Sequence, residues 1–133
     1  SAPNLVSKEM VKSMNKDAII FSMANPNPEI TYDDAKQAGA RIVGTGRSDK
    51  PNQINNLLAF PGLFRGLLDG GAIKMDEDIK IIVSKAIASL ISEDELNDEY
   101  IIPSVFDERL VPTIAREVSD YVKKTGNSRL CQS

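Results

Sequence analysis

Hydrophobic residues near the amino end of the chain form two short runs, each of which leads into a polar turn. The first run covers residues 18–23 and the second covers residues 40–43. The first run is hydrophobic apart from Ser22, which favours a strand buried on both faces of a parallel sheet. Between the runs, Thr31 and Asp34 have the spacing of a capping box and Gly39 is a natural helix terminator. The pattern therefore predicts a strand, a helix and a strand, which together form a βαβ unit.

Beyond Asn52 the hydrophobic spacing becomes helical. It extends over residues 54–68, but Pro61 and Gly62 interrupt it, and proline ends or kinks a helix. We therefore expect two helical pieces in this stretch. Three further amphipathic helices are expected over residues 7–14, 76–90 and 109–124. The last helix is expected to bury Val111, Ile114, Ala115, Val118, Tyr121 and Val122.

These elements predict an α/β fold, a partial Rossmann-like doubly wound parallel sheet with flanking helices and a helical carboxyl-terminal part. Only two or three strands are expected, whereas a complete dinucleotide fold has more. Such a sheet would have an unpaired edge, which favours pairing with another chain. We expect the domain to cover residues 1–126 and residues 127–133 to form a disordered tail.

Composition and charge narrow the functional classes. A chain of 133 residues suits one domain, and its net charge of −3 argues against a nucleic-acid-binding surface. No apolar run approaches the roughly 20 residues that a membrane-spanning helix needs. The single cysteine, Cys131, lies in the polar tail and fits a reducing compartment. The absence of histidine removes the commonest general base near neutral pH.

The candidate chemistry lies in polar turns that follow the two predicted strands. Residues 24–29 follow the first strand, residues 44–49 follow the second, and Asn55 and Asn56 begin the next helix. Ligands of parallel α/β sheets bind outside the carboxyl ends of the strands, so we expect these turns to line one cleft. The glycine spacing in 44–49 fits neither the dinucleotide nor the P-loop pattern.

Each asparagine also has a plain structural interpretation. The Asn25 amide can bridge a ligand to the backbone, but Asn-Pro is also common turn chemistry. One asparagine would suffice as a helix N-cap, whereas Asn55 and Asn56 are two in succession. The start of a helix favours a bound anion. Arg47 can pair with Asp49 or with a carboxylate ligand.

The turns together resemble the nucleotide-binding domain of malic enzymes of the shorter bacterial type. The resemblance rests on residues 24–29, 44–49, 51–56 and 60–62 in this order, and runs from about Ser1 to Gly126. It implies an NAD(P)-dependent, cytoplasmic oxidoreductase that converts malate to pyruvate and acts as a homo-oligomer, a dimer. In the family, hydride leaves the C2 carbon of malate for the nicotinamide, and a divalent cation, Mg or Mn, polarises the keto acid.

The resemblance also implies roles for individual residues. Asn56 and Asn25 would bind the substrate, and the cofactor would be bound by Asn25, Thr45, Gly46, Ser48 and Asn55. No catalytic residue and no metal ligand is expected in this chain, because the family's lysine, tyrosine and acidic ligands would lie upstream of Ser1. The acidic residues 76–78 are interpreted as the first turn of a helix. The chain would then be the carboxyl-terminal portion of the enzyme's NAD(P)-binding domain, inactive alone.

Two alternatives remain open from the sequence. One is a non-catalytic dimerisation or nucleotide-binding module from a truncated dehydrogenase, and the other is a different dehydrogenase with a similar nucleotide-binding half. The choice between NAD and NADP also stays open, because the residue that senses the ribose 2′ position would lie upstream.

Overall fold

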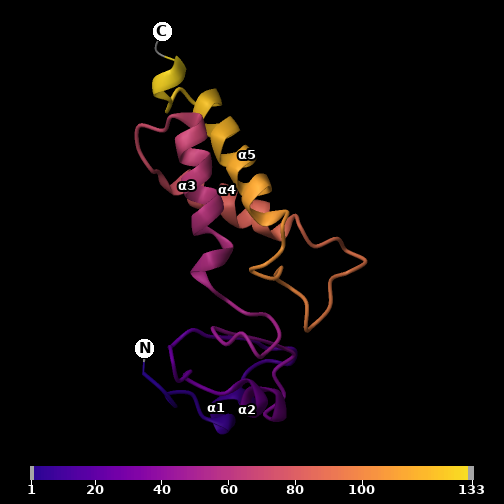
Figure 1. Ribbon diagram of the computed structural model, residues 1–133. Helices are drawn as coiled ribbons and strands as arrows, with labels where there is room; N and C mark the ends of the chain where they lie inside the picture. Colours follow the sequence, from indigo (N-terminus) through magenta and orange to yellow (C-terminus); the bar gives the residue numbers. More distant parts are fainter. Residues whose placement is uncertain (1, 132–133) are drawn as a thin grey trace. The chain divides into compact units, whose positions relative to one another are not determined.

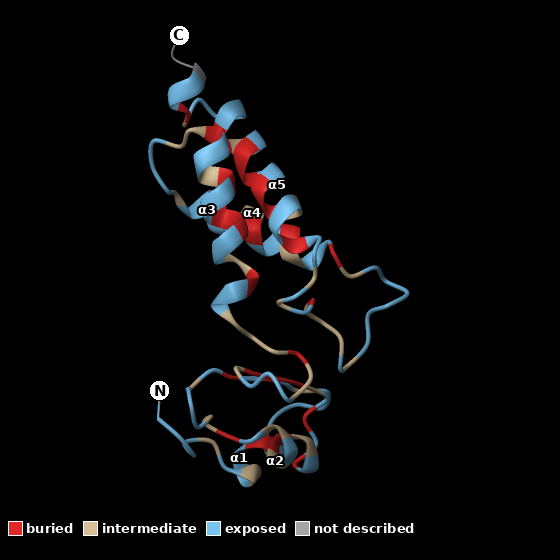
Figure 2. Cartoon of the chain, in the orientation of Figure 1, coloured by how far each residue is buried: buried red, intermediate tan, exposed pale blue. Residues whose placement is uncertain are grey.

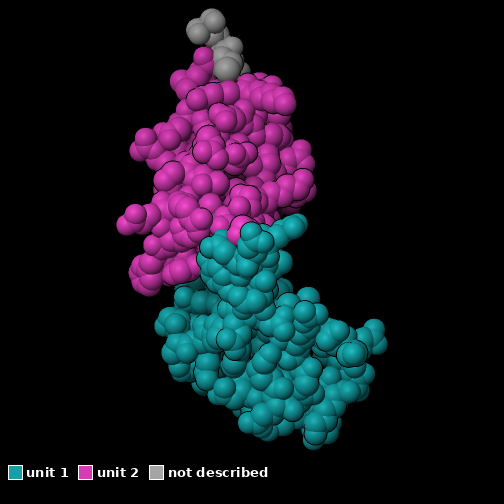
Figure 3. Space-filling model, turned by 90° about the vertical axis from the view of Figure 1, so that its right-hand side faces the viewer, with its two compact units in different colours: residues 1–55, 93–102 teal, residues 56–92, 103–133 magenta. Residues whose placement is uncertain are grey.

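The computed structural model describes residues 2–131, which fall into two compact units. Unit 1 comprises residues 1–55 and 93–102, and unit 2 comprises residues 56–92 and 103–133. Figure 3 shows the two units in different colours. The chain thus leaves unit 1 after Asn55, and residues 93–102 return to it before the chain ends in unit 2.

Unit 1 is a βαβ unit preceded by a short helix. Its elements are α1 (Lys8–Lys12), β1 (Ile19–Ser22), α2 (Tyr32–Gln37) and β2 (Ile42–Thr45). The strands pair in parallel, from Ile19 opposite Ile42 to Ser22 opposite Thr45. The predicted parallel pairing is confirmed, although β2 begins two residues later than the hydrophobic run.

Local sequence signals define the helices of unit 1. The Ser7 hydroxyl accepts the Met10 N–H at 3.2 Å at the start of α1, and the Thr31 hydroxyl accepts the Asp34 N–H at 3.1 Å at the start of α2. Gly39, with φ of 99°, follows α2. The helices pack with the strands around one core, made of Val11, Ile20, Ile30, Ala35, Ala38, Ala40 and Val43.

The expectation that the first strand is buried on both faces is wrong for this chain. Ile20 and Ser22 are buried, whereas Ile19 and Phe21 on the opposite face of β1 are 54% and 51% exposed. Helices α1 and α2 contribute to the core on the Ile20 face, and no described helix of unit 1 belongs to a core on the other face. The largely apolar run of residues 18–23 therefore forms a strand with one covered face.

Unit 2 is helical. It contains the 3₁₀ helix η1 (Asn56–Leu58), α3 (Phe60–Gly70), α4 (Glu77–Ala88), α5 (Leu110–Lys124) and the 3₁₀ helix η2 (Arg129–Cys131). Pro61 lies in the first turn of α3, where its missing N–H costs no helical hydrogen bond. Gly71 ends α3 in the left-handed conformation, and the Asp76 carboxylate accepts the Ile79 N–H at 3.0 Å to cap α4. The interpretation of residues 76–78 as a first helical turn is confirmed.

Helices α3 and α4 both pack against α5, which lies beside them in Figure 1. Figure 2 shows the buried residues on the facing sides of these helices. On α5 the buried positions are Leu110, Ile114, Ala115, Val118, Ser119 and Val122. Val111, expected in the core, is 40% exposed. Tyr121, also expected in the core, is half-buried. Its hydroxyl group donates a hydrogen bond to Asp78 at 3.1 Å.

The tail after α5, which the sequence predicts to be disordered, contacts the end of α3 through Ser128 and Arg129. Ser128 is fully buried, forms an antiparallel bridge with Ala72 and donates its hydroxyl hydrogen to the Gly70 carbonyl. The Arg129 N–H donates to the Gly71 carbonyl at 2.8 Å. These bonds satisfy carbonyl groups at the end of α3, which gives the tail a fixed place. Residues 132 and 133 lie outside the described residues, and so does the side chain of Cys131.

No helix among residues 2–131 has the combination of length and apolar character that crossing a bilayer requires.

Candidate ligand site at the carboxyl ends of the strands

The two strands of unit 1 end at the same edge of the sheet. Ser22, the last residue of β1, lies opposite Thr45, the last residue of β2. The loop that contains Asn25 and the loop that contains Gly46 and Ser48 therefore begin side by side. Both loops leave the carboxyl ends of parallel strands, which is where α/β folds place their ligands.

The loop after β1 is held by hydrogen bonds to its backbone. The Glu29 carboxylate accepts the Ala24 N–H at 3.0 Å, and the Val6 N–H donates to the Glu29 carbonyl at 3.1 Å. Asn25 is exposed on this loop and precedes Pro26 through a cis peptide bond. The structure therefore places Asn25 on an ordered turn at the sheet edge.

The loop after β2 is shaped by Thr45. This side chain is fully buried, and its hydroxyl oxygen accepts the Arg47 N–H at 3.2 Å. The observed contact of Thr45 is thus inside the turn, and its predicted contact with a cofactor stays a prediction. Ser48, two residues beyond Gly46, is exposed.

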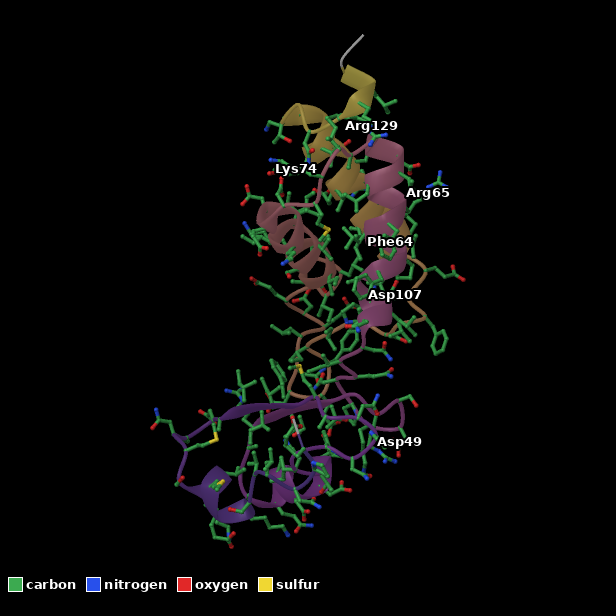
Figure 4. All side chains as sticks on the ribbon, turned by 90° about the vertical axis from the view of Figure 1, so that its left-hand side faces the viewer. Asp49, Phe64, Arg65, Lys74, Asp107 and Arg129 are labelled. Carbon is green, nitrogen blue, oxygen red and sulfur yellow. The ribbon has the colours of Figure 1, made fainter. Side chains whose placement is uncertain are left out.

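Arg47 pairs with Asp49 in two parallel hydrogen bonds, each of 2.8 Å; Figure 4 labels Asp49. The hydrogen bonds, followed by the attraction of the opposite charges, raise the pKa of the Arg47 guanidinium. The same hydrogen bonds hold the pKa of the Asp49 carboxyl below its usual range. Of the two roles left open for Arg47, the structure shows the pairing with Asp49.

Gly46 leaves open space beside the backbone. A Cβ atom added there would meet only the Ile54 carbonyl oxygen, 3.8 Å away. Packing within the described chain therefore does not demand a glycine at this position. A glycine beside open space lets a ligand approach the backbone closely, which fits the predicted cofactor role.

The loop folds back onto β2 before it leaves unit 1. The Ile54 N–H donates to the Thr45 carbonyl at 2.7 Å, and Gln53 forms a bridge with Thr45. A Cβ atom on Gly44 would lie 2.8 Å from the Cδ1 atom of Ile54. A larger residue at position 44 would therefore require the Ile54 side chain of the returning loop to shift.

Asn52, which the sequence analysis did not select, is the buried polar residue of this loop. It is 5% exposed, and its Nδ2 atom donates to the carbonyl oxygens of Val43 at 3.2 Å and Asp98 at 2.9 Å. Its Oδ1 atom accepts the Ile101 N–H at 2.9 Å. The Asn-x-x-Asn-Asn spacing of residues 52–56 was visible in the sequence, but only the fold shows which asparagine faces inward.

The predicted site residues Asn55 and Asn56 belong to different units: Asn55 ends the first part of unit 1, and Asn56 begins unit 2. Asn55 is half-buried at the end of the first part of unit 1, and Asn56 is exposed at the start of η1 in unit 2. The Asn56 carbonyl accepts the Ala59 N–H at 3.0 Å. The loops that carry Asn25 and residues 45–48 thus begin at one sheet edge, while the convergence of Asn25, Asn56 and the 45–48 loop on one site stays a prediction.

Residues 2–131 contain no cluster of three or more histidine, cysteine, aspartate or glutamate side chains arranged to hold a metal ion.

Comparison with known proteins identifies relatives over nearly the whole chain. Residues 1–124 match the family described as malic enzyme, NAD binding domain. The chain is 56% identical over 130 residues to a bifunctional malic/malolactic enzyme of Bacillus subtilis, covering 98% of this chain and 32% of that protein. It is 50% identical over 129 residues to an NAD-dependent malic enzyme of Geobacillus stearothermophilus, covering 97% and 27%.

A solved structure agrees with these relatives. The chain superimposes on a malic enzyme from Pyrococcus horikoshii with a TM-score of 0.89 and 48% identity, over 96% of this chain and 29% of that one. The α/β fold expected from the sequence is therefore confirmed. The chain spans about a third or less of the length of each of these proteins.

Proposed function

This chain belongs to the malic enzyme family, and we propose that the protein of which it is part oxidatively decarboxylates malate to pyruvate with NAD or NADP. One structural observation supports the proposal: β1 and β2 end side by side, and the polar loops that contain Asn25, Gly46 and Ser48 begin at that sheet edge. Relatives named NAD-dependent and NADP-dependent both match the chain, so the proposal includes either cofactor.

The proposed work of this chain is binding and orientation. Asn25, Gly46, Ser48 and Asn55 would hold the dinucleotide, with Thr45 shaping the turn beneath it. When bound, the nicotinamide would accept the hydride from the C2 carbon of malate. Asn25 and Asn56 would orient malate through their amides, which can donate to a carboxylate. Fixing the reactants in this way lowers the barrier without any proton transfer by this chain.

Several finer features of the proposal follow the family resemblance. The divalent cation, Mg or Mn, would be held mainly by residues upstream of Ser1, and the described residues supply no ligand cluster of their own. Residues 1–126 would be the carboxyl-terminal portion of the NAD(P)-binding domain. The protein would act in the cytoplasm as a homodimer.

The test is an assay of the full-length protein and of the 133-residue chain side by side. With malate, NAD or NADP, and Mg or Mn, the full-length protein is expected to form NAD(P)H and pyruvate in equal amounts. The chain alone is expected to form neither. Dinucleotide binding without malate turnover by the full-length protein would instead support a non-catalytic binding module, and turnover by the chain alone would refute its proposed role as an inactive part.

A further inference from the structure

We propose that Asn52 is a positioning residue, which fixes the loop after β2 in the conformation that presents Ser48 and Asn55 to the cofactor. The inference rests on the proposed function for the identity of the ligand. We call the hydrogen bonds of the buried Asn52 side chain to the main chain of unit 1 the clamp.

The Asn52 amide makes three hydrogen bonds to the main chain of unit 1. Its two donated bonds join β2, at the Val43 carbonyl, to the returning segment 93–102, at the Asp98 carbonyl. Its accepted bond, from the Ile101 N–H, holds the same segment a second time. Both amide hydrogens and one oxygen lone pair are used, so the side chain is close to saturated.

The clamp joins two points of the chain that are far apart in sequence. Asn52 lies three residues before the chain leaves unit 1, and residues 93–102 are the part that returns to it. One side chain therefore ties the departing loop to the returning segment. Asn55 follows on the same stretch of backbone, so its position depends on this tie.

The backbone at Asn52 is itself unusual. Its φ angle of 55° lies in the left-handed region, which asparagine tolerates better than most residues and which glycine adopts freely. Its carbonyl oxygen would lie 3.1 Å from a Cβ atom on Gly44. The turn at Asn52 thus lies directly against β2. The left-handed backbone and the side-chain hydrogen bonds of this one residue both hold the turn there.

Two roles for Asn52 give different results on substitution. If Asn52 only supplies the left-handed turn, Asn52→Gly will behave like the unmodified protein, because glycine adopts this conformation without strain. If the side-chain clamp positions the loop, Asn52→Gly and Asn52→Ala will both lose the three bonds and show the same functional defect. The two variants will then differ only in stability, because alanine is strained in the left-handed backbone conformation and glycine is not.

The experiment uses the full-length protein with Asn52→Gly, Asn52→Ala and a control, Arg41→Met. The control removes the exposed ion pair between Arg41 and Asp98, at 3.0 Å, and so loosens the same returning segment without touching the loop. Amide hydrogen exchange at Ile101 and Ile54, NAD(P) affinity by calorimetry, the malate kinetics and the melting temperature are measured for each variant.

We expect both Asn52 variants to show amide exchange at Ile101 and Ile54 about tenfold faster, and Kd and KM for the dinucleotide about tenfold higher. The kcat should change by less than about threefold. Asn52→Gly should melt below the unmodified protein because buried backbone groups lose their partners, and Asn52→Ala should melt lower still. The control should keep its dinucleotide affinity. Unchanged affinity and exchange in Asn52→Gly, or loss of folding in both variants, would overturn the proposal. Exchange and calorimetry need no turnover, so an unmodified protein inactive on malate would refute the proposed function separately.

Discussion

Gly66 of α3 lies so close to Val118 of α5 that a Cβ atom on the glycine would be 2.7 Å from the valine Cβ. Gly62 and Gly70 lie four residues before and after Gly66. A Cβ atom on Gly62 would be 2.7 Å from the Ile114 Cβ, and one on Gly70 would be 3.0 Å from the Val122 Cγ1. Residues four apart lie on one face of a helix, so the three glycines form a groove along α3 that receives the branched side chains of α5. This contact is the central packing of unit 2.

The first prediction concerns this groove. Gly66→Ala should destabilise the protein by about 1 to 3 kcal/mol, because the added methyl group forces the helices apart. At an unpacked helical position the same change would stabilise, since alanine has the higher helix propensity. Thermal melts of the full-length variant measure the sign, with Leu68→Ala, at a 78% exposed position of the same helix, as the control. A melting temperature at or above that of the unmodified protein would show that the contact is not tight.

A second prediction concerns the buried hydroxyl of Thr45. Thr45→Val keeps the shape of the side chain but removes the acceptor of the Arg47 N–H, at a cost of about 1 kcal/mol. We expect faster amide exchange at Arg47 and a severalfold weaker dinucleotide affinity as the 46–48 loop loosens. Thr45→Ser keeps the acceptor and should resemble the unmodified protein in both measurements. Equal exchange at Arg47 in the valine and serine variants would remove the basis for this role of the hydroxyl.

The third prediction is a pH dependence at the start of α5. The Asp107 carboxylate accepts bonds from the Arg109 side chain, at 2.7 and 3.0 Å, and from the Arg109 N–H at 2.9 Å; Figure 4 labels Asp107. The side-chain bonds first, and then the backbone bond, hold the pKa of Asp107 below its usual range. A carboxyl whose pKa is lower in the folded state stabilises that state above its unfolded pKa, about 3.9, and loses this contribution as pH falls through the folded pKa.

Asp107→Asn should therefore lower stability near neutral pH, by about 0.5 to 1 kcal/mol for a pair at the surface. The difference in melting temperature between variant and unmodified protein should shrink as pH falls from about 5 to about 3. Glu108→Gln, at the exposed neighbouring position, is the control for the loss of one negative charge. A difference that stays constant across this pH range would exclude the Asp107 carboxylate as the titrating group.

The sequence was sufficient for the elements whose ends carry local chemistry. Ser7, Thr31 and Asp76 begin helices through their own side chains, and Gly71 ends one through its backbone. These signals act within one turn, so they can be read without knowing the fold. The polar turns after both strands were found for the same reason, since each is punctuated by glycine or proline.

The features that could not be predicted from the sequence depend on contacts between segments far apart in the chain. Nothing near Ser128 predicts that it pairs with Ala72, and the contact of the tail with the end of α3 depends on that pairing. The inward direction of Asn52 likewise depends on residues 98 and 101, nearly fifty positions away. Phe21 was assigned to a doubly covered strand because its run is apolar, but coverage is a property of the packed layers.

Asn56 is the residue on which the account of substrate binding depends most directly. In the full-length protein, Asn56→Ala removes an amide proposed to donate to the malate carboxylate, and a hydrogen bond to a charged group is worth about 1.5 to 3 kcal/mol. Asn55→Ala is the matched comparison, since its neighbouring amide is assigned to the cofactor.

The measurement is steady-state kinetics with malate and dinucleotide varied separately, on variants shown by thermal melts to be folded. We expect Asn56→Ala to lower kcat/KM for malate roughly ten- to hundredfold while the KM for the dinucleotide changes little. Asn55→Ala should instead raise the KM for the dinucleotide. A folded Asn56→Ala protein with unchanged kcat/KM for malate would show that Asn56 only begins a helix and would contradict the account.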